Sequence, residues 1–299
     1  IVPFARGGEI CRNADSIIEE VTRLVNDGYK DITLLGQTVN RWINPIYDQE
    51  LKQGMIANTR IPGLNTNLMQ KPDCDQPKDF LQLLQRLDQI PGEWWMTFVS
   101  SHPNYMTTEL IEFLATSKHF RPYLHFALQS GSDQILKRMN RRHNIKEFVE
   151  KAKHFQKIIP GVGLSTDIIV GFPGETEAQF LATADVMKDI GFDMAFISEF
   201  SPRKGTAAGL LKDDIEHHEK ERRKQYLNDE ILAKSSHTNN KRMLNTKQRL
   251  LVEVVFDDRT FKGRTGNFKD TRVENPDQVE VKPGQFVEIE ITECTPWAL

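Results

Sequence analysis

Stretches of helical periodicity alternate with short apolar runs from about residue 14 to residue 200. A helix is predicted over Asp15–Asn26, where apolar side chains repeat on one face and Gly28 ends the pattern. Strands are predicted at 31–35, 95–100, 123–128, 164–170 and 192–200. Their apolar runs are nearly continuous, as in parallel strands covered on both faces. The pattern therefore predicts an α/β fold, and it fits a barrel and a doubly wound sheet equally well.

The later part of the chain departs from this rhythm. A charged helix is predicted from Asp213 to Ser236, with Asp213 and Asp214 at its start. Beyond it, residues 248–256, 261–266 and 285–291 alternate like strands, which predicts a small all-β, barrel-like module.

Three parts are expected from these patterns. They are an α/β domain at 1–211, a linking helix at 212–240 and the β module at 241–299. Within the first part, residues 43–76 show no clear period and are rich in Asn, Pro, Gly and Gln, which predicts a loop or insertion.

Composition narrows the class of protein. The 299 residues are 38% hydrophobic, enough for a sizeable core, and the net charge of -3 argues against a uniformly basic coat. The three cysteines, Cys11, Cys74 and Cys294, lie too far apart for local metal chelation, so we expect no metal ligands in this chain. No apolar run could span a bilayer and no signal peptide is visible, so we expect a cytoplasmic protein without a membrane partner.

Polar residues follow each predicted strand, where the loops of a parallel sheet converge on a site. The candidate binding residues are Gln37, Ser101, Gln129, Asp167, Gly171, Glu175 and Arg203. A single polar strand end is usually only a loop, but five together predict a site. Asp167 lies within an apolar strand, so it is either paired or faces the site. No P-loop, GxSxG elbow or HExxH helix is present, which disfavours kinases and common hydrolases.

Basic residues are concentrated at the front of the β module. From Lys234 to Arg272 there are ten Lys or Arg and four Asp or Glu, a local net charge of +6, with phenylalanines between them. Such a mixture is typical of surfaces that bind single-stranded or loop RNA, although a charged surface over an ordinary core has the same composition. The candidate RNA-binding residues are Lys241, Arg242, Arg259, Lys262, Arg264, Lys269 and Arg272.

Several blocks of the chain resemble the MiaB-type methylthiotransferases, a radical-SAM family. Gly36-Gln37-Thr38-Val39-Asn40 resembles that family's GQNVN stretch and follows Pro3-Phe4-Ala5-Arg6-Gly7 at the family's distance. Further family-like blocks stand in order at 100–103, 128–133, 136–141, 167–176 and 201–207. The final module looks like a TRAM domain, an RNA-binding β-barrel. The match covers nearly the whole chain apart from residues 43–76.

The resemblance implies a partial TIM-type (β/α) radical-SAM barrel followed by the TRAM-like barrel. In this family a [4Fe-4S] cluster cleaves S-adenosyl-L-methionine (SAM) to a 5′-deoxyadenosyl radical, a second cluster delivers sulfur, and a second SAM supplies the methyl group. The product is a 2-methylthio group on the N6-isopentenyladenosine beside the anticodon. The partner would be the tRNA anticodon stem-loop, bound by a monomer, and the sulfur donor is not identified.

The resemblance also gives the candidate residues a place. By their position at strand ends, Gln37, Ser101, Gln129, Asp167 and Arg203 would line the cavity for SAM or substrate, and Gly171 to Glu175 would border the adenine of SAM. None of them is assigned a catalytic role.

The family's CxxxCxxC motif should stand directly before Ile1, and it is not in this sequence. We therefore expect the native protein to be longer and these 299 residues to be inactive alone. Two alternatives stay open, a related enzyme that methylthiolates an aspartate of a ribosomal protein and a non-catalytic RNA-binding remnant. A cluster-free barrel enzyme would need His102, Asp167 and Glu199 as acid and base, and nothing in the sequence orders them into a mechanism.

Overall fold

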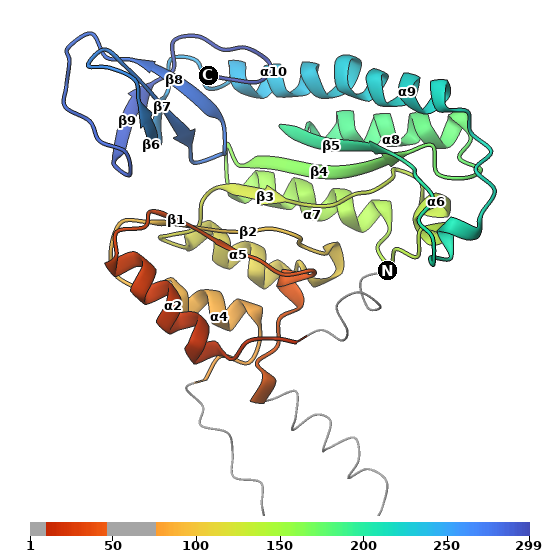
Figure 1. Ribbon diagram of the computed structural model, residues 1–299, viewed down its shortest axis with the longest axis horizontal. Coiled ribbons are helices and arrows are strands. Elements are labelled where there is room, and N and C mark those ends of the chain that lie inside the picture. The colour runs from red at the N-terminus through yellow and green to blue at the C-terminus, as the bar shows by residue number, and fades with distance from the viewer. Residues whose placement is uncertain (1–9, 47–75) are drawn as a thin grey trace, which may run out of the picture.

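Five parallel strands stand side by side in the order of the sequence (Figure 1). The computed structural model describes residues 10–46 and 76–299. In one sheet β1 (Asp31–Leu34) pairs with β2 (Trp95–Phe98), and in another β3 (Tyr123–His125), β4 (Gly163–Val170) and β5 (Met194–Glu199) pair in that order. Parallel bridges from Met96 to Phe120 and from Ser101 to Phe126 connect the two sheets.

This strand order decides between the two architectures that the pattern allowed. A doubly wound sheet reverses its strand order at a switch point, whereas a barrel keeps neighbouring strands consecutive. The order is consecutive from β1 to β5, so the described strands wind as in a barrel. The predicted α/β class is confirmed. Much of the predicted insertion, residues 47–75, lies outside the described residues.

Helices cover one face of the strands, and their hydrophobic sides form the main core. They are α2 (Ala14–Asn26), α4 (Phe80–Leu87), α5 (Thr108–Thr116), α6 (Asp133–Arg138), α7 (Ile145–Ile158) and α8 (Glu177–Ile190), with short 3-10 turns η1 (Val39–Arg41), η3 (Pro103–Tyr105) and η4 (Ala208–Leu210). Phe126, which follows β3, stacks on Phe148 of α7 with ring centroids 4.2 Å apart. Of the helices that the structure describes, none has the length and apolar content needed to cross a membrane.

A long helical segment follows β5. It consists of α9 (His217–Tyr226), a π-helical stretch η5 (Leu227–Leu232) and α10 (Ala233–Lys241). The helix was predicted to begin at Asp213, which was wrong, because α9 begins at His217. Asp213 and Asp214 precede the helix and accept hydrogen bonds there. Asp213 accepts hydrogen bonds from Nζ of Lys220 at 2.7 and 2.6 Å, and Asp214 accepts one from the backbone N–H of Gly174 at 2.7 Å.

The C-terminal β module is an antiparallel four-stranded sheet. Its strands β6 (Lys247–Val255), β7 (Thr260–Thr265), β8 (Asp270–Glu274) and β9 (Phe286–Glu290) lie in the order β8-β7-β6-β9. Among the four strands β8 and β9 do not pair with each other, and beyond β8 there is only an isolated parallel bridge from Asp270 to Ala298, so the strands form an open sheet and do not show the predicted barrel. Leu250, Val252 and Phe261 form its small buried core.

The β module docks at the amino-terminal ends of the parallel strands, at the upper left of Figure 1. Arg121, just before β3, is fully buried and donates hydrogen bonds to the carbonyl oxygens of Thr265 and Gly266. Lys269 forms a buried ion pair with Asp193 at 2.9 Å. The carboxyl ends of the strands lie at the opposite end and remain free of the module.

Candidate active site

Polar side chains line the face of the strands that the helices do not cover, which we call the open face. His125 of β3 is hydrogen bonded through Nδ1 to Oγ of Ser165 at 2.9 Å and through Nε2 to Oδ2 of Asp167 at 3.1 Å. The hydroxyl of Tyr123 lies 2.6 Å from the same Ser165 Oγ. Burial raises the pKa of Tyr123, so it is a neutral hydrogen-bonding group near neutral pH. The four residues form one connected network.

Asp167 is both paired and exposed, which resolves the alternative left by the sequence. One carboxylate oxygen is held by His125, and 41% of the side chain is accessible to solvent. Burial lowers the pKa of Arg141, and the negative charge of Asp167 opposes that shift. Arg141 and His125 were not among the candidates from the sequence, since neither is distinguished there by strand-end position.

The backbone is strained where the strands lead into their loops. Ser100 and Gln129 adopt positive φ angles of 64° and 71°, a region that costs non-glycine residues energy. The backbone N–H of Gln129 donates to the carbonyl of Asp167 at 2.8 Å, which brings these two candidates together. Ser101 is 2% exposed, and its Oγ has no hydrogen-bond partner among the described residues. Strain and an unpaired buried hydroxyl at one edge are typical of a ligand site.

Glu175 holds the loop after β4 in place. It is 4% exposed and accepts hydrogen bonds from the backbone N–H of Gly171 at 2.8 Å and from Nη1 of Arg223 at 2.9 Å. Burial raises the pKa of Glu175, and these two partners oppose the shift. Because its carboxylate is already bound by the protein, we reassign Glu175 from ligand contact to positioning of the Gly171 loop.

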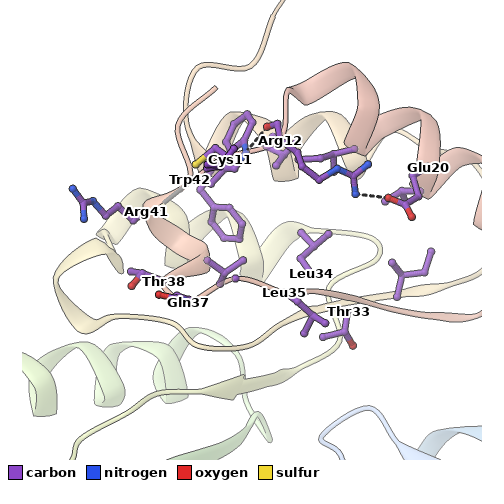
Figure 2. A pocket seen from close by; sticks show the side chains of 18 of the residues that line it. Cys11, Arg12, Glu20, Thr33, Leu34, Leu35, Gln37, Thr38, Arg41 and Trp42 are labelled. Carbon is purple, nitrogen blue, oxygen red and sulfur yellow. Dashed lines mark hydrogen bonds and ion pairs between the residues drawn. The ribbon is translucent and has the colours of Figure 1, made fainter. Parts of the chain in front are cut away.

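Gln37 lies apart from this network, beside a cavity of about 640 Å³ at the edge of β1. Figure 2 shows Gln37 and Thr38 at one side of the cavity and the ion pair of Arg12 with Glu20 at another. Apolar side chains of α2 and α4 form much of the remaining wall. Arg203 is exposed in the loop after β5, and no described contact joins it to Asp167.

The histidine and glutamate considered for acid–base catalysis have structural roles. Nδ1 of His102 accepts a hydrogen bond from the N–H of Asn104 and caps the turn η3. Burial, followed by the charge of His143, lowers the pKa of His102. Glu199 lies 3.0 Å from His217 and 3.5 Å from Lys224, both on α9. No described hydrogen bond or ion pair joins the three residues that a cluster-free enzyme would need.

Comparisons with known proteins identify the family. A family model described as the Radical SAM superfamily matches residues 4–187, more than half of the 299 residues. This chain belongs to the radical SAM superfamily. Enzymes of the superfamily generally use SAM and a [4Fe-4S] cluster.

Curated relatives align with all or nearly all of this chain. A tRNA-2-methylthio-N(6)-dimethylallyladenosine synthase from Neisseria gonorrhoeae is 36% identical over 306 residues, which cover 100% of this chain and 61% of the relative. A protein of the same name from Protochlamydia amoebophila is 36% identical over 284 residues, covering 93% of this chain and 56% of the relative. The chain thus spans about 61% of the length of the first relative.

Solved structures are more distant. Coproporphyrinogen III oxidase from Escherichia coli matches with a TM-score of 0.46 and 14% identity, covering 74% of this chain and 46% of that one. So distant a match says nothing of function.

The candidate RNA-binding residues divide by exposure. Lys262 on β7 and Arg272 on β8 are exposed register partners, and the Arg272 guanidinium lies 5.9 Å from the ring of Phe256, which is 55% exposed. Like charges directly opposite each other destabilise a sheet, and a bound anion such as a phosphate would relieve this repulsion between Lys262 and Arg272. Lys269 is 6% exposed and paired with Asp193, so its predicted RNA contact is replaced by a role in domain docking.

The remaining candidates of this group also differ. Arg264 is half-buried and lies 3.4 Å from Glu253 and 3.3 Å from Asp270, which partly neutralise it. Arg259 is exposed in the β6–β7 turn, and Lys241 and Arg242 are exposed at the end of α10.

Proposed function

We propose that this radical SAM protein methylthiolates N6-isopentenyladenosine next to the anticodon of tRNA, as the substrate-binding part of a longer enzyme. The observation that carries the proposal is the 36% identity to a protein of that named activity over an alignment that covers 100% of this chain. The alternative of a ribosomal-protein aspartate as substrate is not favoured by the names of these relatives.

The open face fits SAM. The buried, unpartnered Oγ of Ser101 offers a hydrogen bond to a ligand, and the strained Gln129 presents its backbone beside Asp167. Gly171, at a φ of 68°, turns the chain after β4 so that its backbone can approach a ligand. We propose that these residues, together with Gln37 and Arg203, hold SAM or substrate. When bound, SAM supplies the radical chemistry of the superfamily.

The described residues do not fit an iron–sulfur cluster. Among residues 10–46 and 76–299, no three His, Cys, Asp or Glu side chains lie together as metal ligands. Cys11 and Cys294 are free thiols far apart in the sequence. We therefore assign no step to a cluster in this part of the protein, while the proposed activity uses two [4Fe-4S] clusters in the full enzyme.

The β module supplies the proposed RNA-binding surface. We define this surface by Lys262, Arg272, Arg259 and Phe256, where exposed cations surround an exposed ring. Phosphates bind such cations and unstacked bases bind such rings. Lys241, Arg242 and Arg264 flank it. The module would act as a TRAM-like domain at 241–299, joined through 212–240 to the radical-SAM domain at 1–211, in a cytoplasmic monomer.

A chimeric enzyme tests the proposal. The segment of the Neisseria gonorrhoeae relative that matches this chain is replaced by residues 1–299, so that the relative supplies the remaining sequence. The chimera is expressed in a bacterium that lacks its own enzyme, and tRNA nucleosides are analysed by liquid chromatography and mass spectrometry. We expect 2-methylthio-N6-isopentenyladenosine to appear.

The unmodified relative is the positive control. A folded, cluster-containing chimera that yields no 2-methylthio nucleoside would contradict the proposal. Intact-mass analysis of ribosomal proteins from the same cells tests the aspartate substrate. RNA binding without any methylthio product would instead support the alternative that the protein is a non-catalytic RNA-binding remnant.

A further inference from the structure

The open face carries an exposed aromatic ring directly beside an exposed carboxylate. Phe196 on β5 is 54% exposed, and its register partner on β4 is Asp167. The neighbouring Met194, two residues before Phe196, is also 38% exposed. Residues two apart on a strand share one face, so Met194 and Phe196 form an exposed apolar patch, and such patches commonly mark binding surfaces.

His125 fixes the direction of the carboxylate. Its Nε2 holds Oδ2 of Asp167, and its Nδ1 is in turn held by Ser165. The other oxygen, Oδ1 of Asp167, has no hydrogen-bond partner in the described part of the chain. The rings of His125 and Phe196 lie 6.0 Å apart at 55°. Oδ1 of Asp167 is therefore an unpaired acceptor among the described residues, and it belongs to the strand position that pairs with Phe196.

We propose that Phe196 and Asp167 form a subsite for an adenine ring, in which the base stacks on Phe196 and its exocyclic N6–H donates to Oδ1 of Asp167. Stacking on an aromatic side chain together with a hydrogen bond at the base edge is the usual way in which proteins bind an unstacked base. An ionised carboxylate only accepts hydrogen bonds, so it selects a ring that presents an N–H and disfavours a carbonyl. His125 is a positioning residue that acts through Asp167.

The choice of probes rests on the proposed function. Two ligands of that function contain an adenine ring. One is the adenine of SAM and the other is the target adenosine of the RNA. The subsite chemistry is the same for both, and binding measurements separate the two sources.

The experiment uses the 299-residue chain and two probes in calorimetric titrations. The first probe is S-adenosyl-L-homocysteine, and the second is an anticodon-type RNA hairpin whose loop carries either adenosine or purine riboside, which lacks the exocyclic amine. We expect Phe196→Ala to weaken binding of one probe about tenfold, within the range for loss of one stacked base. The probe that responds identifies the source of the ring.

Further variants test the hydrogen bond and the role of His125. If the RNA responds, Asp167→Ala should weaken the adenosine hairpin severalfold and leave the purine hairpin unchanged. If S-adenosyl-L-homocysteine responds, Asp167→Ala should weaken that probe. His125→Ala should reproduce the Asp167→Ala effect, whereas His125→Gln, whose amide can still donate to Asp167, should restore binding. A merely structural histidine would show no such rescue.

Tyr29→Ala is the matched control, because Tyr29 is an aromatic residue with 59% exposure in the turn before β1. Thermal melts establish that every variant is folded. Unchanged binding of both probes by Phe196→Ala would overturn the proposal, as would a wild-type chain that binds neither probe. Failure of the proposed function is seen separately, as absence of the methylthio product from the unsubstituted chimera.

Discussion

Arg121 joins the strands to the β module, and its removal is predicted to release that module. The side chain is fully buried, with Asp31 as its ion-pair partner and two module carbonyls as acceptors. Its guanidinium lies over the rings of Trp95 and Phe268, at 4.5 and 4.3 Å from their centroids. Burial lowers the pKa of Arg121 to about 10 while Asp31 opposes the shift, so the group is charged at neutral pH.

The free-energy cost of Arg121→Ala is estimated from the carboxylate of Asp31, which the substitution leaves without a partner. Oδ1 of Asp31 is already buried without a partner, and the substitution removes the partner of Oδ2 as well. Breaking a buried ion pair by deleting one partner costs about 3–5 kcal/mol. The module's own buried cluster, Leu250, Val252 and Phe261, is small even with the partly buried side chains that pack on it, so a released module has little to keep it folded. A loss of about 4 kcal/mol raises the population of the opened module about a thousandfold.

Hydrogen exchange followed by mass spectrometry measures this opening. Amide protection in β6 to β9 should fall by up to about a thousandfold in Arg121→Ala, while β3 and β4 keep theirs. Lys247→Ala is the control within the module, because Lys247 pairs with Glu288 at side-chain exposures of 73% and 65%. Such a fully exposed pair contributes little to stability. Unchanged protection in the module of Arg121→Ala would refute the reasoning, as would an equal loss throughout the chain.

Three further predictions concern other parts of the molecule. Replacing Lys262 and Arg272 together by Ala should weaken hairpin RNA binding and reduce the slope of log K against log salt by about 1.4, with Lys282→Ala as control; an unchanged slope contradicts the RNA surface. The side-chain hydrogen bond from Arg222, aided by Arg223, holds the pKa of Glu219 at about 2, below its ordinary 4.5. Because the folded-state pKa is depressed, Glu219 stabilises the fold above pH 4.5 and loses this effect as the pH falls to about 2, so thermal melts of Glu219→Gln should show less acid sensitivity there. A Cβ on Gly131 would lie 2.4 Å from Cα of Thr183, so Gly131→Ala should lower stability by about 1–3 kcal/mol in denaturant titrations; an unchanged midpoint would show that α8 moves freely.

The apolar pattern predicted the parallel strands well because β2 and β4 are short runs that are largely buried. The strand predicted at 164–170 is confirmed as β4, and the helix predicted at Asp15–Asn26 is confirmed within one residue. β8 was missed because Asp270–Glu274 is short and its charged side chains alternate with only two less polar ones. Its position is set by pairing with β7, which is a tertiary effect that sequence periodicity does not contain.

The site was harder to predict, because strand-end position identifies loops but not which side chains meet across strands. Asp167 was found because a carboxylate inside an apolar run is unusual. Phe196 was not, since a phenylalanine in a strand is ordinarily core, and only the register with Asp167 and the exposed ring distinguish it. Lys269 was misassigned for the opposite reason, because local charge cannot show that a lysine is buried against Asp193.

The β module contacts the network of the open face, so the proposed RNA-binding surface and the proposed adenine subsite are structurally connected. Phe268 of the module stacks on Tyr123 with ring centroids 4.5 Å apart, and Tyr123 begins the hydrogen-bonded network that ends at Asp167. Docking of the module therefore contacts the same residues that position the carboxylate. Arg121→Ala should then weaken adenine recognition at Asp167 as well as release the module, and where RNA is the probe that responds to Phe196→Ala, the adenosine and purine hairpins should bind that variant alike. If the variant still distinguished the two hairpins while the module was open, the open face would be organised by the strands alone.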